Sequence, residues 1–159
     1  MCIRARPNGV GSANQTLKNG STAGTLEFVT HRGFITYAII HDKKTGTDGG
    51  TFTSGAWQTR DLSTTPVADP DSIVSVSSNQ FTLGAGSYLI EASAPAFDCN
   101  RHQLRVYNAT TSAVVEYGQN TTCSATYSGH THAFVSARTT ITGDTAFEIQ
   151  HRCQTTKAT

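Results

Sequence analysis

Charged residues are scarce in this sequence, at 14% of its 159 positions, and lysine and arginine form no cluster. Proteins that bind nucleic acid neutralise phosphates with clustered basic side chains, so we do not expect DNA or RNA as a partner. No apolar run approaches the roughly 20 residues that span a bilayer, so we expect no membrane insertion. The first residues also lack the apolar segment of a secretory signal peptide, which argues against a secreted protein.

Recognisable catalytic motifs are also missing. The sequence has no Gly-x-Ser-x-Gly and no His-Glu-x-x-His, and its glycine-rich stretch 84–87 lacks the lysine of a phosphate-binding loop. His151 and Cys153 are two positions apart and would share one face of a strand, as a Cys–His nucleophile requires. Because a cysteine at a strand end is more often simply buried, we predict that the protein is not an enzyme.

The cysteines lack the close pairing of a typical zinc site. Cys2, Cys99, Cys123 and Cys153 lie far apart in the chain, and no two of them form a Cys-x-x-Cys pair. Buried free thiols are the simplest interpretation, and a disulfide between Cys99 and Cys123 is an alternative that spacing does not decide.

Threonine and serine, by contrast, make up about a quarter of the chain. Apolar residues occur in short runs that often alternate with polar ones, which is typical of strands with one buried face. With turn residues recurring about every 8–12 positions, this pattern predicts an all-β, antiparallel sandwich or barrel of roughly eight to ten strands and no significant helix. The predicted strands are Thr25–Thr30, Phe34–His41, Ile73–Val76, Gln80–Leu83, Tyr88–Ala94, His102–Tyr107, Ala113–Tyr117, Phe134–Ile141 and Thr145–His151. Phe34–His41 is apolar on both faces, as in a buried strand. Pro95 is predicted to end the strand Tyr88–Ala94.

The chain divides into two regions by composition. Residues 1–24 are rich in Gly, Asn, Ser and Thr and nearly devoid of large apolar side chains, which predicts a polar linker or anchoring arm. Residues 25–159 carry the strand pattern and are predicted to form one head domain.

The stretch from Gly49 to Leu62 stands out within the predicted head. It contains the only tryptophan, Trp57, which we expect to bury its indole, within a short extended segment. Arg60 and Asp61 are expected to form a buried or interface ion pair, with a weak surface pair as the alternative.

Four ordered motifs together resemble a known family. They are Gly49–Leu62, Phe81–Tyr88, His102–Asn108 and Thr145–Cys153. In this order they resemble a jelly-roll module of bacteriophage tail fibres and other virion proteins, which is similar to the trimeric heads of tumour-necrosis-factor-like and complement-type proteins. The resemblance covers about residues 34–156.

The resemblance implies a ten-stranded jelly roll, a homotrimer with aromatic and apolar residues on its axis, and no enzymatic activity. Members of this group usually continue past the His-Arg-Cys motif into a final strand, so we expect that strand to be missing here or its place to be covered by another chain. The residues that carry the resemblance, called the signature residues below, are Trp57, Arg60, Asp61, Leu62, Tyr88, His102, Arg105, Phe147 and His151.

His130-Thr131-His132 is the sharpest candidate for a metal site. On an extended segment both imidazoles, of His130 and His132, lie on one face. In a trimer, three such pairs around the axis would offer six nitrogens to one transition metal, such as Fe, Ni, Zn or Cu. The alternative is a polar segment whose histidines face solvent. No other cofactor is expected.

Several aspartates could supply oxygen ligands to calcium. Asp42, Asp48, Asp61, Asp69 and Asp71 supply oxygen atoms but form no Asp-x-Asp-x-Asp-Gly loop. Because calcium needs six to eight oxygens, these residues are predicted to form turns instead.

We therefore expect a virion structural protein, a homotrimeric fibre or spike head that binds a host-surface glycan or envelope protein without catalysis. A capsid decoration or vertex protein, which binds capsid or fibre subunits, is the first alternative. A secreted binding module of the complement-head type is the second. Loops on a rigid scaffold commonly carry such contacts, and the candidate contact loops are Asp42–Gly50, Asp98–Arg101 and Asn120–Gly129.

Overall fold

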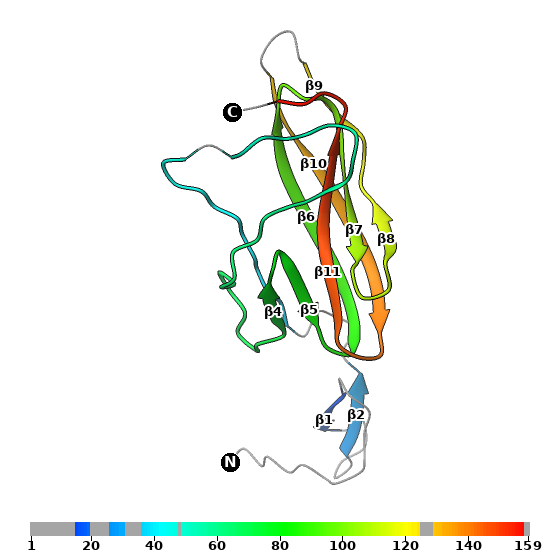
Figure 1. Cartoon of the computed structure of the whole chain (residues 1–159). Helices are drawn as coiled ribbons and strands as arrows, with labels where there is room; N and C mark the ends of the chain where they lie inside the picture. Colours follow the sequence, from blue (N-terminus) through cyan, green and yellow to red (C-terminus); the bar gives the residue numbers. More distant parts are fainter. Residues whose placement is uncertain (1–14, 20–25, 31–35, 48, 125–128, 158–159) are drawn as a thin grey trace. The chain divides into compact units, whose positions relative to one another are not determined.

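The computed structural model describes residues 15–19, 26–30, 36–47, 49–124 and 129–157. The chain forms two compact units, Met1–Tyr37 and Ala38–Thr159, and each is described by itself. The described residues contain β-strands and no helix, and every strand pair is antiparallel (Figure 1). The predicted all-β, antiparallel class is therefore confirmed.

The first unit contains a β-hairpin. Strands β1 (Gln15–Asn19) and β2 (Leu26–Thr30) pair with Gln15 opposite Thr30 and Asn19 opposite Leu26. The strand predicted at Thr25–Thr30 is confirmed as β2. Strand β1 lies inside residues 1–24, where the composition predicted an arm. Backbone groups of a strand need a partner, and composition does not reveal that β2 supplies it.

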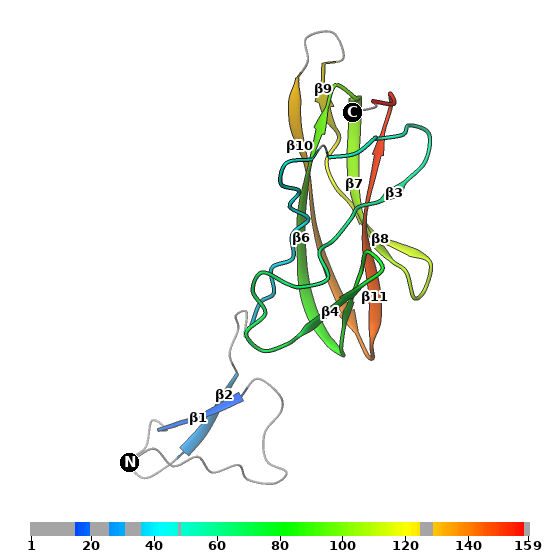
Figure 2. The same cartoon turned by 60° about the vertical axis from the view of Figure 1, so that its left-hand side comes forward.

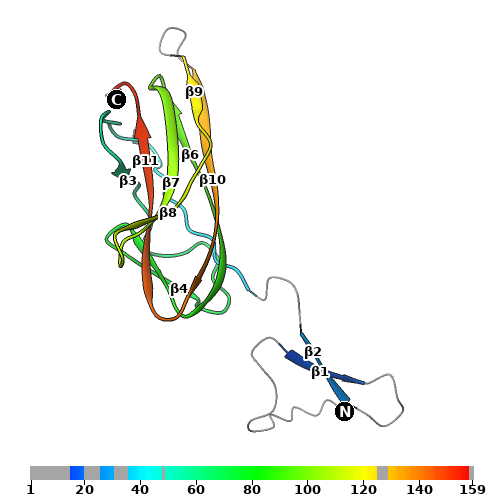
Figure 3. The same ribbon diagram turned by 90° about the vertical axis from the view of Figure 1, so that its right-hand side faces the viewer.

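The second unit consists of two antiparallel layers packed face to face, an arrangement consistent with the predicted sandwich. One layer has the strand order β4-β5-β11-β7-β8, with β3 paired to β11 and β9 paired to β7. The other layer has two strands, β6 and β10. Figures 2 and 3 separate the layers, with β6 and β10 on one side and β7 and β11 on the other. The strands are β3 (Gln58–Thr59), β4 (Val74–Ser77), β5 (Gln80–Leu83), β6 (Gly86–Phe97), β7 (Asn100–Asn108), β8 (Ala113–Tyr117), β9 (Thr121–Cys123), β10 (His130–Ile141) and β11 (Thr145–Cys153).

The core lies between the layers and follows the period-two pattern. Leu104 and Val106 of β7 and Phe147 of β11 are fully buried. Phe147 stacks on Phe81 with the ring centroids 5.7 Å apart. The two-stranded layer contributes mainly small side chains, so its backbone can approach the larger residues of the other layer closely. Those small inward residues are Ala94, Ala133, Val135 and Ala137.

Two local expectations are wrong. Thr36–His41, the described part of the predicted buried strand Phe34–His41, forms only an isolated bridge between Ile39 and Ala68. Tyr37 and Ile39 are 58% and 43% exposed, so apolar composition did not ensure burial there. Pro95 does not end its strand, because β6 continues to Phe97. Within the described residues β6 is paired on one side only, and an edge strand tolerates a proline that cannot donate a hydrogen bond.

Candidate functional site

The outer face of the β6–β10 layer carries exposed apolar side chains. Phe134 is 61% exposed and Leu89 is 37% exposed. The register places Phe134 opposite Ser93, and Leu89 opposite Arg138. In the described part of the chain, β6 has no partner other than β10. This face therefore combines uncovered apolar area with an unpaired strand edge, two features that favour association with another surface.

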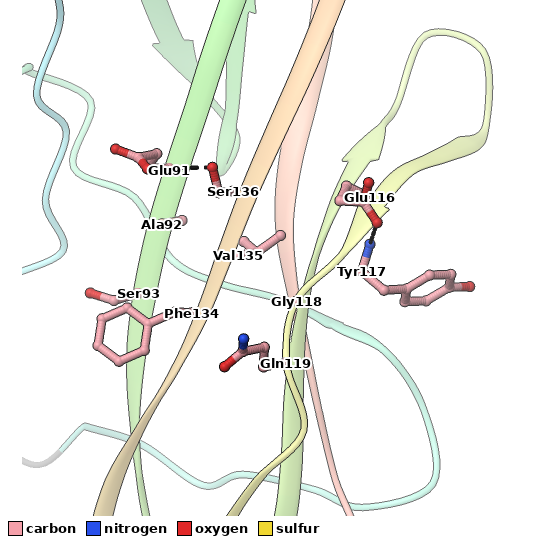
Figure 4. A pocket seen from close by; sticks show the side chains of 10 residues that line it. All are labelled: Glu91, Ala92, Ser93, Glu116, Tyr117, Gly118, Gln119, Phe134, Val135 and Ser136. Carbon is pink, nitrogen blue, oxygen red and sulfur yellow. Dashed lines mark hydrogen bonds between the residues drawn. The ribbon is translucent and has the colours of Figure 1, made fainter.

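A groove of about 650 Å³ is lined by residues 91–93 of β6, residues 134–136 of β10 and residues 116–119 at and after the end of β8. Figure 4 shows Val135 and Gln119 between β10 and the segment that follows β8, with the Tyr117 side chain pointing away from the groove. Two carboxylates line it and are engaged locally, since the Ser136 hydroxyl donates to Glu91 and the Tyr117 N–H donates to Glu116. The groove therefore offers polar contacts and no paired catalytic groups.

His130 and His132 both lie on the outer face of the β6–β10 layer. Their spacing predicted that the two imidazoles share one face. Both are exposed at the start of β10. The ring of His130 contacts Phe97 at a centroid distance of 4.6 Å, and that of His132 lies 6.3 Å from Phe134. Within the chain the pair therefore faces outward beside aromatic rings, and metal binding on a trimer axis stays a prediction.

A buried cluster that contains three cysteines occupies one end of the sandwich, where the β6–β7 turn, β9 and the end of β11 meet (top of Figure 1). Its Cys99 and Cys123 sulfur atoms are 3.2 Å apart, and the N–H of Cys99 donates to the Cys123 sulfur. His102 of β7 lies beside them, because the sulfur atoms and an imidazole nitrogen all fall within 4.8 Å of one another. Cys153 packs into the same buried cluster. We call Cys99, His102, Cys123 and Cys153 the Cys–His cluster.

The His102 ring is held on both sides. Its Nδ1 lies 2.9 Å from Nε2 of His151, and its Nε2 lies 2.8 Å from the Thr131 hydroxyl. His151 is fully buried against Phe52, and its Nδ1 has no hydrogen-bond partner. Burial, and then the neighbouring His102 and Arg60, lower the pKa of His151 to about 3, so its imidazole is neutral at pH 7. Burial and then His132 lower the pKa of His102 as well.

The structure also describes the surroundings of His151 and Cys153, the two residues weighed above as a Cys–His nucleophile. His151 and Cys153 are both buried on β11, consistent with a shared inward face. Activation would need a thiolate beside an imidazolium. Here burial raises the pKa of Cys153, burial and the hydrogen bond with Cys123 raise that of Cys99 to about 12, and His151 is neutral. The protonation states are therefore the reverse of those an active cysteine requires.

Five of the nine signature residues pack in the apolar core or against aromatic rings. Leu62, Tyr88 and Phe147 belong to the apolar core or pack against it. Arg105 lies between aromatic rings, with its guanidinium carbon 4.3 Å from the centroid of Trp57. Trp57 is half-buried rather than a core residue, and its ring also lies 5.7 Å from Tyr117.

The predicted Arg60–Asp61 ion pair is wrong. Asp61 pairs with Lys44 at 3.0 Å instead, and its carboxylate is 57% exposed. The N–H of Arg60 donates to the Ile149 carbonyl at 2.8 Å. Adjacent residues on an extended segment point to opposite sides, so Arg60 and Asp61 do not meet.

The remaining polar candidates have mainly local roles. The Asp69 carboxylate accepts the N–H groups of Ile73 and Val74, which is the predicted turn function. In the predicted contact loop Asp98–Arg101, Asp98 and Cys99 are buried, so only Asn100 and Arg101 are available for contacts. The loop Asp42–Gly50 is exposed in its described residues, and Asp48 lies outside them. Residues 125–128 of the loop Asn120–Gly129 also lie outside them, and β9 occupies Thr121–Cys123.

The Cys–His cluster was not predicted as a unit. Cys99 and His102 form a Cys-x-x-His pair, a close spacing of ligand types that the sequence contains. Cys123 joins them only through the register of β7 with β9, which places Cys123 opposite Asn100. A search for mixed cysteine and histidine pairs would have found the first half of the cluster.

Replacing Trp57 with alanine is expected to lower the free energy of unfolding by about 2 kcal/mol, from lost burial and the lost contact with Arg105. Urea unfolding of the variant measures this loss. Val67→Ala, at a position that is 61% exposed, is the control and should stay within about 0.5 kcal/mol of the parent. A Trp57 loss equal to that of the control would contradict the packing described here.

Searches with this chain found no matching protein-family model, curated protein or solved structure. No helix among the described residues is long and apolar enough to cross a membrane.

Proposed function

We propose that the chain forms a non-catalytic homotrimeric head of a virion fibre or spike, with jelly-roll topology, that binds a host-surface glycan or envelope protein. The antiparallel two-layer sandwich supports this proposal, as does the order of the four motifs that resemble phage fibre modules. Residues 1–37, a compact unit of their own, would serve as the attachment arm.

The trimer proposal rests on the exposed outer face of the β6–β10 layer. Phe134 and Leu89 leave apolar area uncovered on a face that also ends in the unpaired edge of β6. A long unpaired edge is a liability for a protein that remains alone. Three copies arranged around an axis along this face would cover both features by cyclic symmetry. Trimerisation would also turn weak contacts of exposed loops such as Asp42–Gly50 into avidity.

Phe134→Glu is expected to convert the trimer into a monomer, because it would bury three carboxylates near one axis. Native mass spectrometry or light scattering should give about 51 kDa for the parent, three times the chain mass of 16.9 kDa, and 16.9 kDa for the variant. Val67→Glu is the matched control, since Val67 is also 61% exposed and lies outside β6 and β10. A parent that is a stable 16.9 kDa monomer would end the trimer proposal.

The partner is tested separately from the assembly. The purified protein, labelled and applied to a glycan array and to intact bacterial cells, should bind at least one of them if it is a receptor-binding head. Binding to purified capsids instead, or a gene beside the major capsid gene rather than among tail genes, would favour the capsid decoration alternative.

A further inference from the structure

The Cys–His cluster brings together soft metal ligands from separate parts of the fold. Cys99 comes from the β6–β7 turn, His102 from β7, Cys123 from β9 and Cys153 from the end of β11. All four are buried, at 3% exposure or less. Such a concentration of thiol and imidazole groups is confined to this end of the core, because the other inward residues of β7 and β11 are mainly apolar.

The donor set suits one kind of cation. Thiolate sulfur and imidazole nitrogen are the ligands of structural zinc sites, which are tetrahedral and closed to solvent. Two thiolates that bind one zinc ion at about 2.3 Å lie roughly 3.7 Å apart. The Cys99 and Cys123 sulfur atoms lie 3.2 Å apart, so zinc would require them to separate by about half an ångström. A disulfide would require a larger movement, to about 2.05 Å.

The surroundings match those of a metal centre. The backbone N–H of Cys99 donates to the Cys123 sulfur at 3.2 Å, a contact that fixes the position of that sulfur in the cluster. His102 has a partner at each ring nitrogen, His151 and Thr131. One nitrogen would exchange its partner for the cation, and the partner of the other would fix the ring orientation, as outer ligands do in metal sites.

We propose that Cys99, His102 and Cys123, whose ligand atoms lie within 4.8 Å of one another, bind one zinc ion per chain. Cys153, whose thiol donates to the Phe52 carbonyl at 3.7 Å, would turn from that carbonyl to become the fourth ligand. The ion would tie the β6–β7 turn, β9 and the end of β11 together at one end of the sandwich. The site is independent of trimer formation and is distinct from the His130/His132 pair. A metal on the trimer axis would give one ion per three chains, whereas the Cys–His cluster gives one ion per chain.

The test begins with the whole 159-residue chain, purified in reductant without added metal. Elemental analysis by mass spectrometry is expected to find about one zinc per chain. Chelated protein titrated with Co²⁺ should develop the thiolate charge-transfer and ligand-field bands of a tetrahedral site, saturating at one equivalent. These measurements need no variant, so they remain informative if a ligand substitution prevents folding.

Variants locate the site. His102→Gln and Cys123→Ser are expected to lose at least tenfold in zinc affinity, whereas His132→Gln, which changes an exposed histidine of β10, should keep the parent's affinity and stoichiometry. Alkylation of the unfolded parent, followed by mass spectrometry, counts its free thiols and detects a Cys99–Cys123 disulfide.

Three results would overturn the proposal. They are a parent without zinc that also fails to bind Co²⁺, a Cys99–Cys123 disulfide in protein purified without oxidant, and a stoichiometry of one ion per three chains that is lost in His132→Gln.

Discussion

Gly118→Ala is expected to lower the free energy of unfolding by about 3 kcal/mol or more, from steric overlap with a neighbouring strand. Gly118 follows β8 at the point where the chain touches both layers. Its N–H donates to the Leu104 carbonyl of β7 at 2.8 Å, and the N–H of Gln119 donates to the Phe134 carbonyl of β10 at 3.2 Å. A Cβ atom on Gly118 would overlap that Phe134 oxygen. Because the obstacle is backbone, only a shift of β10 or of the crossing segment would relieve it.

Gly143→Ala is the matched control for this prediction. A Cβ atom there meets nothing within 4 Å, so the free energy of unfolding should stay within about 0.5 kcal/mol of the parent's. It could rise slightly, because alanine reduces the conformational entropy of the unfolded chain. Urea unfolding at one fixed chain concentration measures both variants, because the stability of an oligomer depends on concentration. A loss below about 1 kcal/mol for Gly118→Ala would show that the layers are not in contact at this point.

Strands with local signals could be predicted from the sequence. Strands β5 (Gln80–Leu83) and β8 (Ala113–Tyr117) have the predicted bounds. Each is a short run of apolar or alternating apolar and polar residues, and turn residues lie at its ends. Strand β9 (Thr121–Cys123) was missed. Its three residues are mostly polar, and its extended form depends on pairing with β7, which is remote in the chain. The sheet order likewise depends on non-local pairing.

The candidate site could be predicted only in part. His102 and His151 are two of the signature residues, and both are buried. Their contact depends on the register of β7 with β11, which pairs His151 with Leu104 and Cys153 with His102. A shift of one residue would point these side chains to the other face. Composition and spacing do not specify that register, so the sequence alone could not bring Cys153 to His102.

Acidification from pH 6.5 to pH 4.5 is expected to destabilise the metal-free, reduced protein by about 2 kcal/mol through His151. Burial, His102 and Arg60 lower the pKa of His151 to about 3 in the folded chain, whereas an unfolded histidine has a pKa of about 6.5. Between these two values the unfolded state binds a proton that the folded state excludes. Stability is therefore fully present above pH 6.5 and declines as the pH falls toward 3.

The window from pH 6.5 to pH 4.5 separates the effects of His151 and His102 from that of Glu148. Burial opposes ionisation of Glu148, but hydrogen bonds from Gln80, Gln150 and Thr59 outweigh it and lower its pKa from 4.5. The stability that Glu148 contributes is therefore lost only below this window. The pKa of His102 is also lowered, so His102 adds to the loss within the window.

Urea unfolding in the presence of chelator and reductant, repeated across this pH window, measures the effect. His151→Gln removes the titrating imidazole and should flatten the profile to the smaller dependence left by His102. His41→Gln, which replaces an exposed histidine, is the control and should keep the parent's slope. A parent whose stability is constant from pH 6.5 to pH 4.5 would mean that His151 is accessible to protons in the folded chain. In that case the His102–His151 contact would not be the closed, neutral pair that the buried geometry describes.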